Sequence, residues 1–246
     1  MGFRFRPGSG LDEFARVKQQ DARSSMKNMF FILNFHGLGE PSRDIPLEEE
    51  PFWVEVPFFE AVLDLIQGRD DVQITFDDSN ASDYEVALPA LKARSMTAKI
   101  FVLAQQVDQK GYLSTHQLRE MSSRGLTVGS HGMRHCPWTG LDDQALHVDL
   151  VEAKNRLEQI TGRPVTEAAC PFGNYDRRVL RAVRNSGYNK IYTSDDFPAF
   201  ADSWVQSRYT ILRTHDVPQV AEIINGMPRG LARAWPRMKL KWKQLR

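Results

Sequence analysis

Short runs of apolar, β-branched and aromatic residues recur along this chain, and helical patterns lie between them. This alternation is typical of parallel strands, because each parallel neighbour needs a long crossover connection, usually a helix. We therefore expect one α/β domain, built as a barrel or an open sheet of about seven parallel strands. The predicted strands are Phe30–Phe35, Val72–Phe76, Lys99–Leu103, Leu126–Gly129, Glu167–Cys170, Lys190–Thr193 and Tyr209–Leu212.

The intervening stretches place apolar residues at helical spacing, and the clearest are Pro57–Ile66, Leu141–Ile160 and Asp176–Ser186. No linker divides them, so we expect a flexible lead-in over residues 1–28, a catalytic domain over 29–227 and a basic helix or tail over 228–246. The first apolar run is too short for a secretory signal, and no run could span a bilayer. These features predict a cytoplasmic protein.

The balance of charged residues bears on which binding partners the chain could have. Lys and Arg total 32 against 31 Asp and Glu, so no overall field favours nucleic acid. Residues 228–246 hold seven Lys or Arg and no acid, which leaves open a peripheral membrane contact or simply a solvated helix. Nothing indicates an obligate protein partner. The two cysteines, Cys136 and Cys170, are too few for a disulfide framework.

Polar and glycine-containing segments follow most of the predicted strands. Because the carboxyl ends of parallel strands meet at one edge of a sheet or barrel, we expect these segments to converge there, as active sites do in such folds. They are His36–Gly39, Asp77-Asp78, His131 with His135, Pro171–Asp176, Ser194–Asp196 and His215-Asp216.

Two of these segments together predict a metal site. Asp77-Asp78 alone also fits a turn or a helix cap, and His131 and His135, four residues apart, are a weak signal alone. Combined, they offer a catalytic divalent metal one carboxylate and two imidazoles, and the second carboxylate is left to accept a proton from water.

These segments carry a resemblance to the polysaccharide deacetylases that share the NodB-homology domain. Thr75-Phe-Asp-Asp78 is similar to the first motif of that family, Ser130-His-Gly-Met-Arg-His135 contains its His-x-x-x-His motif, and Cys170-Pro-Phe-Gly-Asn-Tyr-Asp176 looks like its third. Phe35-His-Gly-Leu-Gly-Glu-Pro41 and Thr161-Gly-Arg-Pro164 resemble members found with exopolysaccharide synthesis. The resemblance runs from about Phe30 to Pro218, which is most of the chain.

The resemblance implies a distorted (β/α) barrel and an N-deacetylase acting on an N-acetylated glycan, either a polymer, an oligomer or a lipid-linked precursor. It implies that Asp78, His131 and His135 bind a divalent metal, most readily Zn²⁺ and also Co²⁺, and that Asp77 is the general base. A backbone N–H near Phe172 would help to hold the oxyanion.

The chain departs from the family pattern at two places. The third motif usually carries an Arg two residues before its Pro, and here that residue is Ala169; we consider Arg213 as a substitute. His215 follows a predicted strand and is the candidate general acid, although a surface histidine without a role fits equally well.

Further residues are candidates for substrate contact. His36 could touch substrate or support the metal, or it could only satisfy a backbone carbonyl; Tyr175 and Trp204 could stack on sugar rings or pack in the core. Two other function classes stay open. One is an inactive glycan-binding relative, motivated by Ala169 and by the unsettled identity of the general acid; the other is a non-haem iron oxygenase, since two His and one carboxylate also suit iron.

Overall fold

The computed structural model describes residues 29–226, and the expectations for residues 1–28 and 228–246 lie outside them. Eight parallel strands follow one another in the order β10-β8-β7-β6-β5-β4-β1-β11, which confirms the barrel prediction with one strand more than expected. The unpredicted strand is β10, three residues long. The parallel strands are β1 Met29–Phe35, β4 Val72–Phe76, β5 Lys99–Val102, β6 Thr127–Ser130, β7 Glu167–Ala169, β8 Lys190–Thr193, β10 Val205–Ser207 and β11 Tyr209–Thr210.

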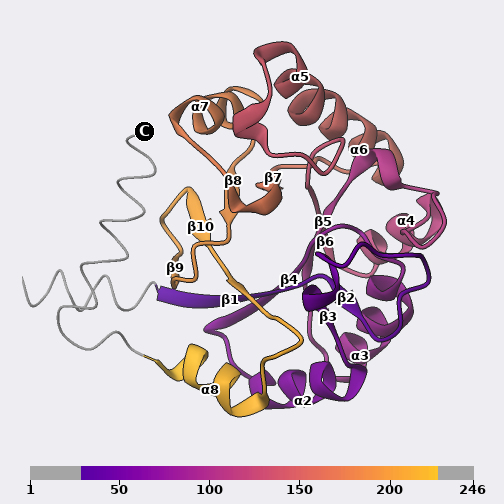
Figure 1. Cartoon of the computed structure of the whole chain (residues 1–246), viewed down its shortest axis with the longest axis vertical. Coiled ribbons are helices and arrows are strands. Elements are labelled where there is room, and N and C mark those ends of the chain that lie inside the picture. The colour runs from indigo at the N-terminus through magenta and orange to yellow at the C-terminus, as the bar shows by residue number, and fades with distance from the viewer. Residues whose placement is uncertain (1–28, 227–246) are drawn as a thin grey trace, which may run out of the picture.

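The two ends of this strand order are neighbours in the chain. A single residue, Arg208, separates β10 from β11, and no helix crosses between them. The chain therefore passes directly from one edge strand of the sheet to the other, and Figure 1 shows the strands curled into a ring. A short strand, β9 (Ala199–Phe200), pairs antiparallel with the start of β1.

Helices surround much of this ring of strands (Figure 1). The predicted helix Leu141–Ile160 is two helices joined by a π-helical turn, Val148–Glu152. The main core lies between the helices and the outward-facing strand residues, such as Leu33 and Phe35 of β1. The helices are α2 Val56–Ile66, α3 Leu88–Ala93, α4 Thr115–Ser123, α5 Asp143–His147, α6 Ala153–Thr161, α7 Arg177–Asn185 and α8 Val217–Asn225.

Inward-facing residues fill the barrel, as in other narrow barrels. A small apolar cluster packs there, with Phe101 and Tyr192 centroids 4.8 Å apart. Side chains alternate between the two faces of a strand. On β1 the inward-facing residue after Ile32 is therefore Asn34, and on β4 the inward-facing Thr75 is followed by Asp77. These residues are buried and polar, so the interior changes from apolar to polar toward the carboxyl ends of the strands.

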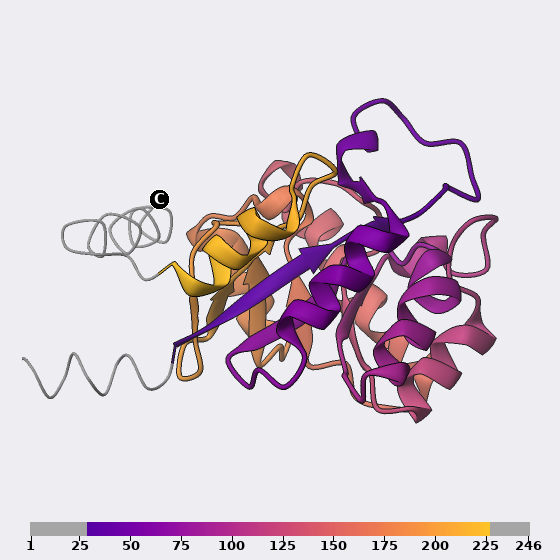
Figure 2. The same ribbon diagram turned by 90° about the horizontal axis from the view of Figure 1, so that it is seen from below.

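The segment after β1 is the longest excursion from the barrel. Two short strands, β2 (Gly37–Leu38) and β3 (Trp53–Val54), pair with each other and leave a loop that projects beyond the strands (Figure 2). Gly37 is required in this pairing, because a Cβ there would lie 2.1 Å from the Trp53 ring. Within residues 29–226, none of the helices has the length and apolar character needed to cross a bilayer.

Candidate active site

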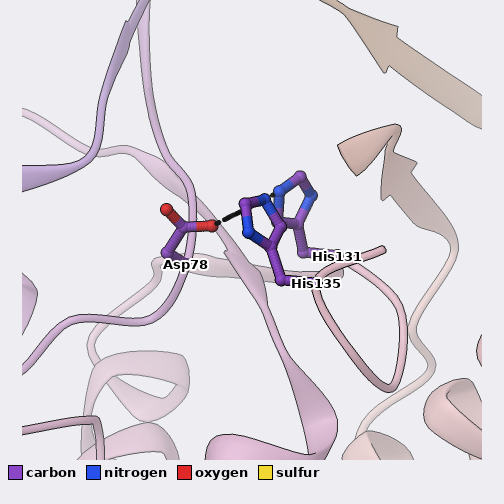
Figure 3. Close-up of side chains that lie close together, drawn as sticks. All are labelled: Asp78, His131 and His135. Carbon is purple, nitrogen blue, oxygen red and sulfur yellow. Dashed lines mark ion pairs between the residues drawn. The ribbon is translucent and has the colours of Figure 1, made fainter. Parts of the chain in front are cut away.

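The predicted ligands come together at the carboxyl ends of β4 and β6. Asp78 Oδ1 lies 3.5 Å from Nε2 of His131 and 3.5 Å from Nε2 of His135. One ligand atom from each residue lies within 4.8 Å of the other two, and the three side chains point toward one another (Figure 3). Two imidazoles and one carboxylate form a ligand set that zinc prefers, with room for water or substrate.

His131 is held in the protonation state that a metal ligand needs. Its ring is buried, and Nδ1 lies 3.0 Å from the carbonyl oxygen of Ala169. Because a carbonyl can only accept, Nδ1 carries the proton and Nε2 presents its lone pair to Asp78. Burial lowers the pKa of His131 to about 3, despite the opposing effect of Asp77, so the imidazole is neutral.

Asp78 is a carboxylate in need of a cation. It follows β4 in the left-handed backbone region, with φ of 71°, which turns its side chain toward the histidines. Its Oδ1 is buried without a hydrogen bond. Burial, reinforced by Asp77, raises the pKa of Asp78 to about 6, although His36 opposes the shift. A divalent ion between Asp78 and the two imidazoles would satisfy the buried Oδ1, so these residues fit a metal.

Asp77 has a different environment. Arg208 donates from Nη1 to Oδ1 at 2.7 Å and from Nη2 to Oδ2 at 2.8 Å, and Asn34 donates to Oδ2 at 3.1 Å. Burial would raise the pKa of Asp77, but the Arg208 charge, helped by His131, outweighs it and holds that pKa below its usual range. The carboxylate is thus ionised and fixed in orientation, with Oδ2 3.9 Å from His131 Nε2.

Arg208 is the residue that the sequence interpretation missed. It is fully buried where β10 meets β11, and its guanidinium also donates to Asn34 Oδ1 at 2.8 Å. Its side chain lies over the Phe101 ring, 5.3 Å from the centroid. The expectation that Arg213 supports the base is not met in this structure, because Arg213 is on the surface and donates to Glu55 at 3.1 Å.

Phe172 forms one rim of the site. It has a φ of 58°, a strained value for a residue other than glycine, and such strain is often retained at functional sites. Its ring is 58% exposed and stacks on His135, with centroids 4.3 Å apart and planes 24° apart. The following Gly173 also has positive φ, and a Cβ there would lie 3.0 Å from Ser194. The turn thus presents an apolar ring to solvent beside a metal ligand.

Comparison with known proteins assigns this geometry to a family. The family described as "Polysaccharide deacetylase" matches residues 66–191, about half of the chain, and this stretch contains Asp77, Asp78, both histidines and Phe172. The chain belongs to the polysaccharide deacetylase family. The Bacillus subtilis protein YxkH, named as a polysaccharide deacetylase, is 29% identical over 147 residues, which are 60% of this chain and 52% of YxkH. The alignment thus spans about half of that relative.

Solved structures of deacetylases share the fold. The Streptococcus pyogenes deacetylase PplD, solved with acetate, superposes with a TM-score of 0.71 at 19% identity, covering 80% of this chain and 98% of PplD. A polysaccharide deacetylase from Bacillus anthracis superposes with a TM-score of 0.70 at 23% identity, covering 80% of this chain and 69% of that protein. IcaB from Ammonifex degensii superposes with a TM-score of 0.62 at 22% identity, covering 80% of this chain and 97% of IcaB. At these identities, the likeness establishes the barrel fold alone.

Two of the predicted substrate contacts lie away from the proposed metal ligands. Tyr175 is buried, and its hydroxyl donates to Asp195 Oδ2 at 2.9 Å, so it braces the loop after β7 rather than facing a sugar. Trp204 precedes β10 and therefore lies at the opposite end of the barrel from the ligands. Its indole donates to the Tyr188 carbonyl, and the Arg184 guanidinium lies 4.7 Å from its ring centroid.

The two other histidines keep their candidate roles. His36 packs against Phe52, with centroids 4.9 Å apart, and its buried Nδ1 has no hydrogen-bond partner. Its charge would influence both Asp77 and Asp78, which places it near the pair. His215 follows β11, and its Nδ1 accepts a hydrogen bond from the Leu212 amide at 3.1 Å. In the neutral ring the proton is therefore on Nε2.

The cysteine near the metal site is not among its ligands. The group of described residues that could hold an ion consists of Asp78, His131 and His135. Cys136 faces Asp149 instead, with its sulfur 3.6 Å from Oδ2. Burial, reinforced by Asp149, raises the pKa of the Cys136 thiol to about 11, so the thiol is protonated and unreactive at neutral pH.

Proposed function

We propose that this chain is a metal-dependent N-deacetylase that hydrolyses the acetamide of an N-acetylated sugar. The observation that carries the proposal is the contrast between two adjacent carboxylates. Asp78 faces two imidazoles with a buried oxygen unsatisfied, whereas Asp77 is ionised and held by Arg208. One is suited to bind a cation and the other to accept a proton.

Each residue has a separable part in the proposed reaction. Asp78, His131 and His135 would hold Zn²⁺ or Co²⁺, and a bound ion supplies Lewis acidity and lowers the pKa of water. Asp77 accepts the proton of the attacking water, and Arg208 keeps its oxygens aimed at the site. The Phe172 N–H is the proposed donor to the oxyanion. A protonated His215 would then donate a proton to the departing amine and return to the neutral imidazole.

The Phe172 ring gives the substrate a place to stack. It is exposed, fixed by its backbone and packed on His135. An apolar ring at a site mouth suits the face of a sugar. We infer that the substrate is an N-acetylglucosamine-type unit of a polysaccharide, an oligosaccharide or a lipid-linked precursor, with exopolysaccharide as the first class to test.

The competing functions lose their main support. The inactive-relative hypothesis is motivated by Ala169 in place of the usual Arg, and Arg208 supplies a guanidinium to Asp77 from another strand. An iron oxygenase would share the two-His, one-carboxylate set, but the chain belongs to a hydrolase family with a parallel barrel.

Acetate release from N-acetylglucosamine oligomers tests the proposal. Metal-stripped protein should be inactive and should recover with Zn²⁺ or Co²⁺. Asp77→Asn should bind Co²⁺ as the wild type does, yet release acetate more slowly by about 10²- to 10⁴-fold, the range for loss of a general base. Asp71→Asn, a surface change of the same chemistry, is the matched control. Full activity of a Co²⁺-loaded Asp77→Asn protein would refute the assigned base.

A further inference from the structure

A buried carboxylate lies beneath the loop that carries both histidine ligands. Asp149 belongs to the π-helical turn between α5 and α6 and has no exposed surface. π-Helical turns are rare and frequently occur at functional sites, because the extra residue redirects a side chain. Here the turn directs Asp149 toward the loop of residues 131–138.

The partners of Asp149 in this structure are residues of that loop. Trp138 donates from Nε1 to Oδ2 at 3.1 Å, and the Cys136 thiol lies 3.6 Å from the same oxygen. The Arg134 guanidinium lies 3.6 Å from Oδ1. One carboxylate thus contacts three side chains within five residues of the chain, on the C-terminal side of His131 and on both sides of His135.

The loop is shaped to receive this carboxylate. Gly132, between the two ligands, has a φ of 89°, and a Cβ there would lie 2.7 Å from Asp149 Oδ2. A side chain at residue 132 would therefore collide with the carboxylate as well as strain the backbone. The same turn is fixed from the other side, since Ser130 Oγ accepts from the Gly132 amide at 3.1 Å and Ala104 N donates to the Gly132 carbonyl at 2.9 Å.

Burying a carboxylate costs free energy unless hydrogen bonds or an opposite charge compensate it. If packing were the sole requirement at this position, an apolar residue would be favoured. We propose that Asp149 is a positioning residue that locks the 131–138 loop, so that the two imidazoles are spaced for an ion before it binds. The inference rests on the proposed metal site and adds a residue to its support. Residues that orient ligands in this way change metal affinity by about 10- to 100-fold when removed.

Asp149→Asn is the direct test. The amide nitrogen would take the place of Oδ2, where it faces the Trp138 N–H and the Cys136 thiol, or of Oδ1, where it faces the Arg134 guanidinium. In either orientation the loop loses contacts while volume is conserved. We expect Co²⁺ to bind at least tenfold more weakly, and the visible bands of the Co²⁺ complex to change because the ligand geometry changes. Trp138→Phe, which removes only the Nε1 donor, should weaken Co²⁺ binding in the same direction.

Two controls separate positioning from general stability. Asp143→Asn makes the same change in α5 on an exposed side chain and should leave Co²⁺ binding unaltered. Ile224→Ala opens the core beneath α8, which packs against α2, and should lower the melting temperature without changing the Co²⁺ spectrum. If loss of stability alone weakened Co²⁺ binding, Ile224→Ala would weaken it as well.

Amide hydrogen exchange gives a readout that needs no metal. In metal-free Asp149→Asn, peptides covering residues 131–138 should exchange at least tenfold faster than in the wild type, while peptides from β4 and β5 should be unchanged. Unaltered exchange together with a Co²⁺ dissociation constant within twofold of wild type, in both Asp149→Asn and Trp138→Phe, would overturn the inference. Failure of wild-type protein to bind Co²⁺ would instead refute the proposed function, and the exchange result would still decide whether Asp149 locks the loop.

Discussion

Replacing Arg208 should change the pH dependence of the proposed deacetylation. In Arg208→Met, Asp77 would lose both charge-assisted hydrogen bonds, of 2.7 and 2.8 Å, while staying buried. Burial would then dominate, so the pKa of Asp77 should rise above its usual range instead of lying below it. The base would be protonated over part of the working range, and the acid limb of the kcat/KM profile should move to higher pH.

The Arg208→Met substitution should also lower the free energy of unfolding. Removing one partner of a buried ion pair costs about 3–5 kcal/mol, because the other charge is left uncompensated. In the wild type the folded pKa of Asp77 lies below the unfolded value, so the pair stabilises the protein above about pH 4 and that stability is lost as the pH falls further. In Arg208→Met the sign reverses, and protonation of Asp77 should favour folding.

Urea unfolding and acetate release, both measured between pH 4 and pH 9, test this reasoning. Arg213→Met is the matched control, since it removes the same charge from an exposed pair with Glu55 and should change neither measurement. Arg208→Lys keeps a charge but not the paired donors, so intermediate values are expected. An acid limb in Arg208→Met that coincides with that of the wild type would show that Arg208 does not govern Asp77.

Two further outcomes follow from the site. Because burial raises the pKa of Asp78 to about 6 in the metal-free protein, protons should compete with Co²⁺ below that pH, and titration calorimetry at pH 5, 6 and 7 should show affinity falling as the pH decreases; constant affinity would contradict the role of Asp78. Phe172→Ala should raise KM for N-acetylglucosamine oligomers several-fold while Co²⁺ binding stays within twofold, and an unchanged KM would argue against sugar stacking on this ring.

The sequence predicted that the proposed metal ligands lie together, because their positions depend on where the strands end. A strand ends at Phe76 and another at Ser130, and parallel strands bring the following residues to one end of the barrel. Periodicity and strand direction determine this convergence, so they are enough to group the Asp77-Asp78 pair with His131 and His135. The alternation of strands and helices left a barrel or an open sheet, and the family resemblance implied both the barrel and the choice of Asp78 as ligand.

Arg208 could not be found in that way. It stands between two very short strands, and nothing in Val205–Ser207 distinguishes a strand from a loop. Its burial depends on Asp77, 131 residues earlier, and on closure of the ring. The sequence feature that could have indicated Arg208 is an arginine directly after the short strand Val205–Ser207, and this feature can be recognised only after that strand has been identified. The sequence left stacking and core packing both open for Trp204 and Tyr175 for a related reason, because an aromatic residue looks the same in sequence whether it packs inside or faces a substrate.

The seam between β10 and β11 gives this enzyme an order of assembly. All three proposed ligands come from the first 135 residues, whereas the arginine that orients the base comes at residue 208. A chain emerging from the ribosome would therefore possess the means to hold an ion well before it could direct a proton. Only when the last two strands complete the circle does Asp77 gain its counter-charge, so the proposed hydrolysis would begin with the closing of the barrel.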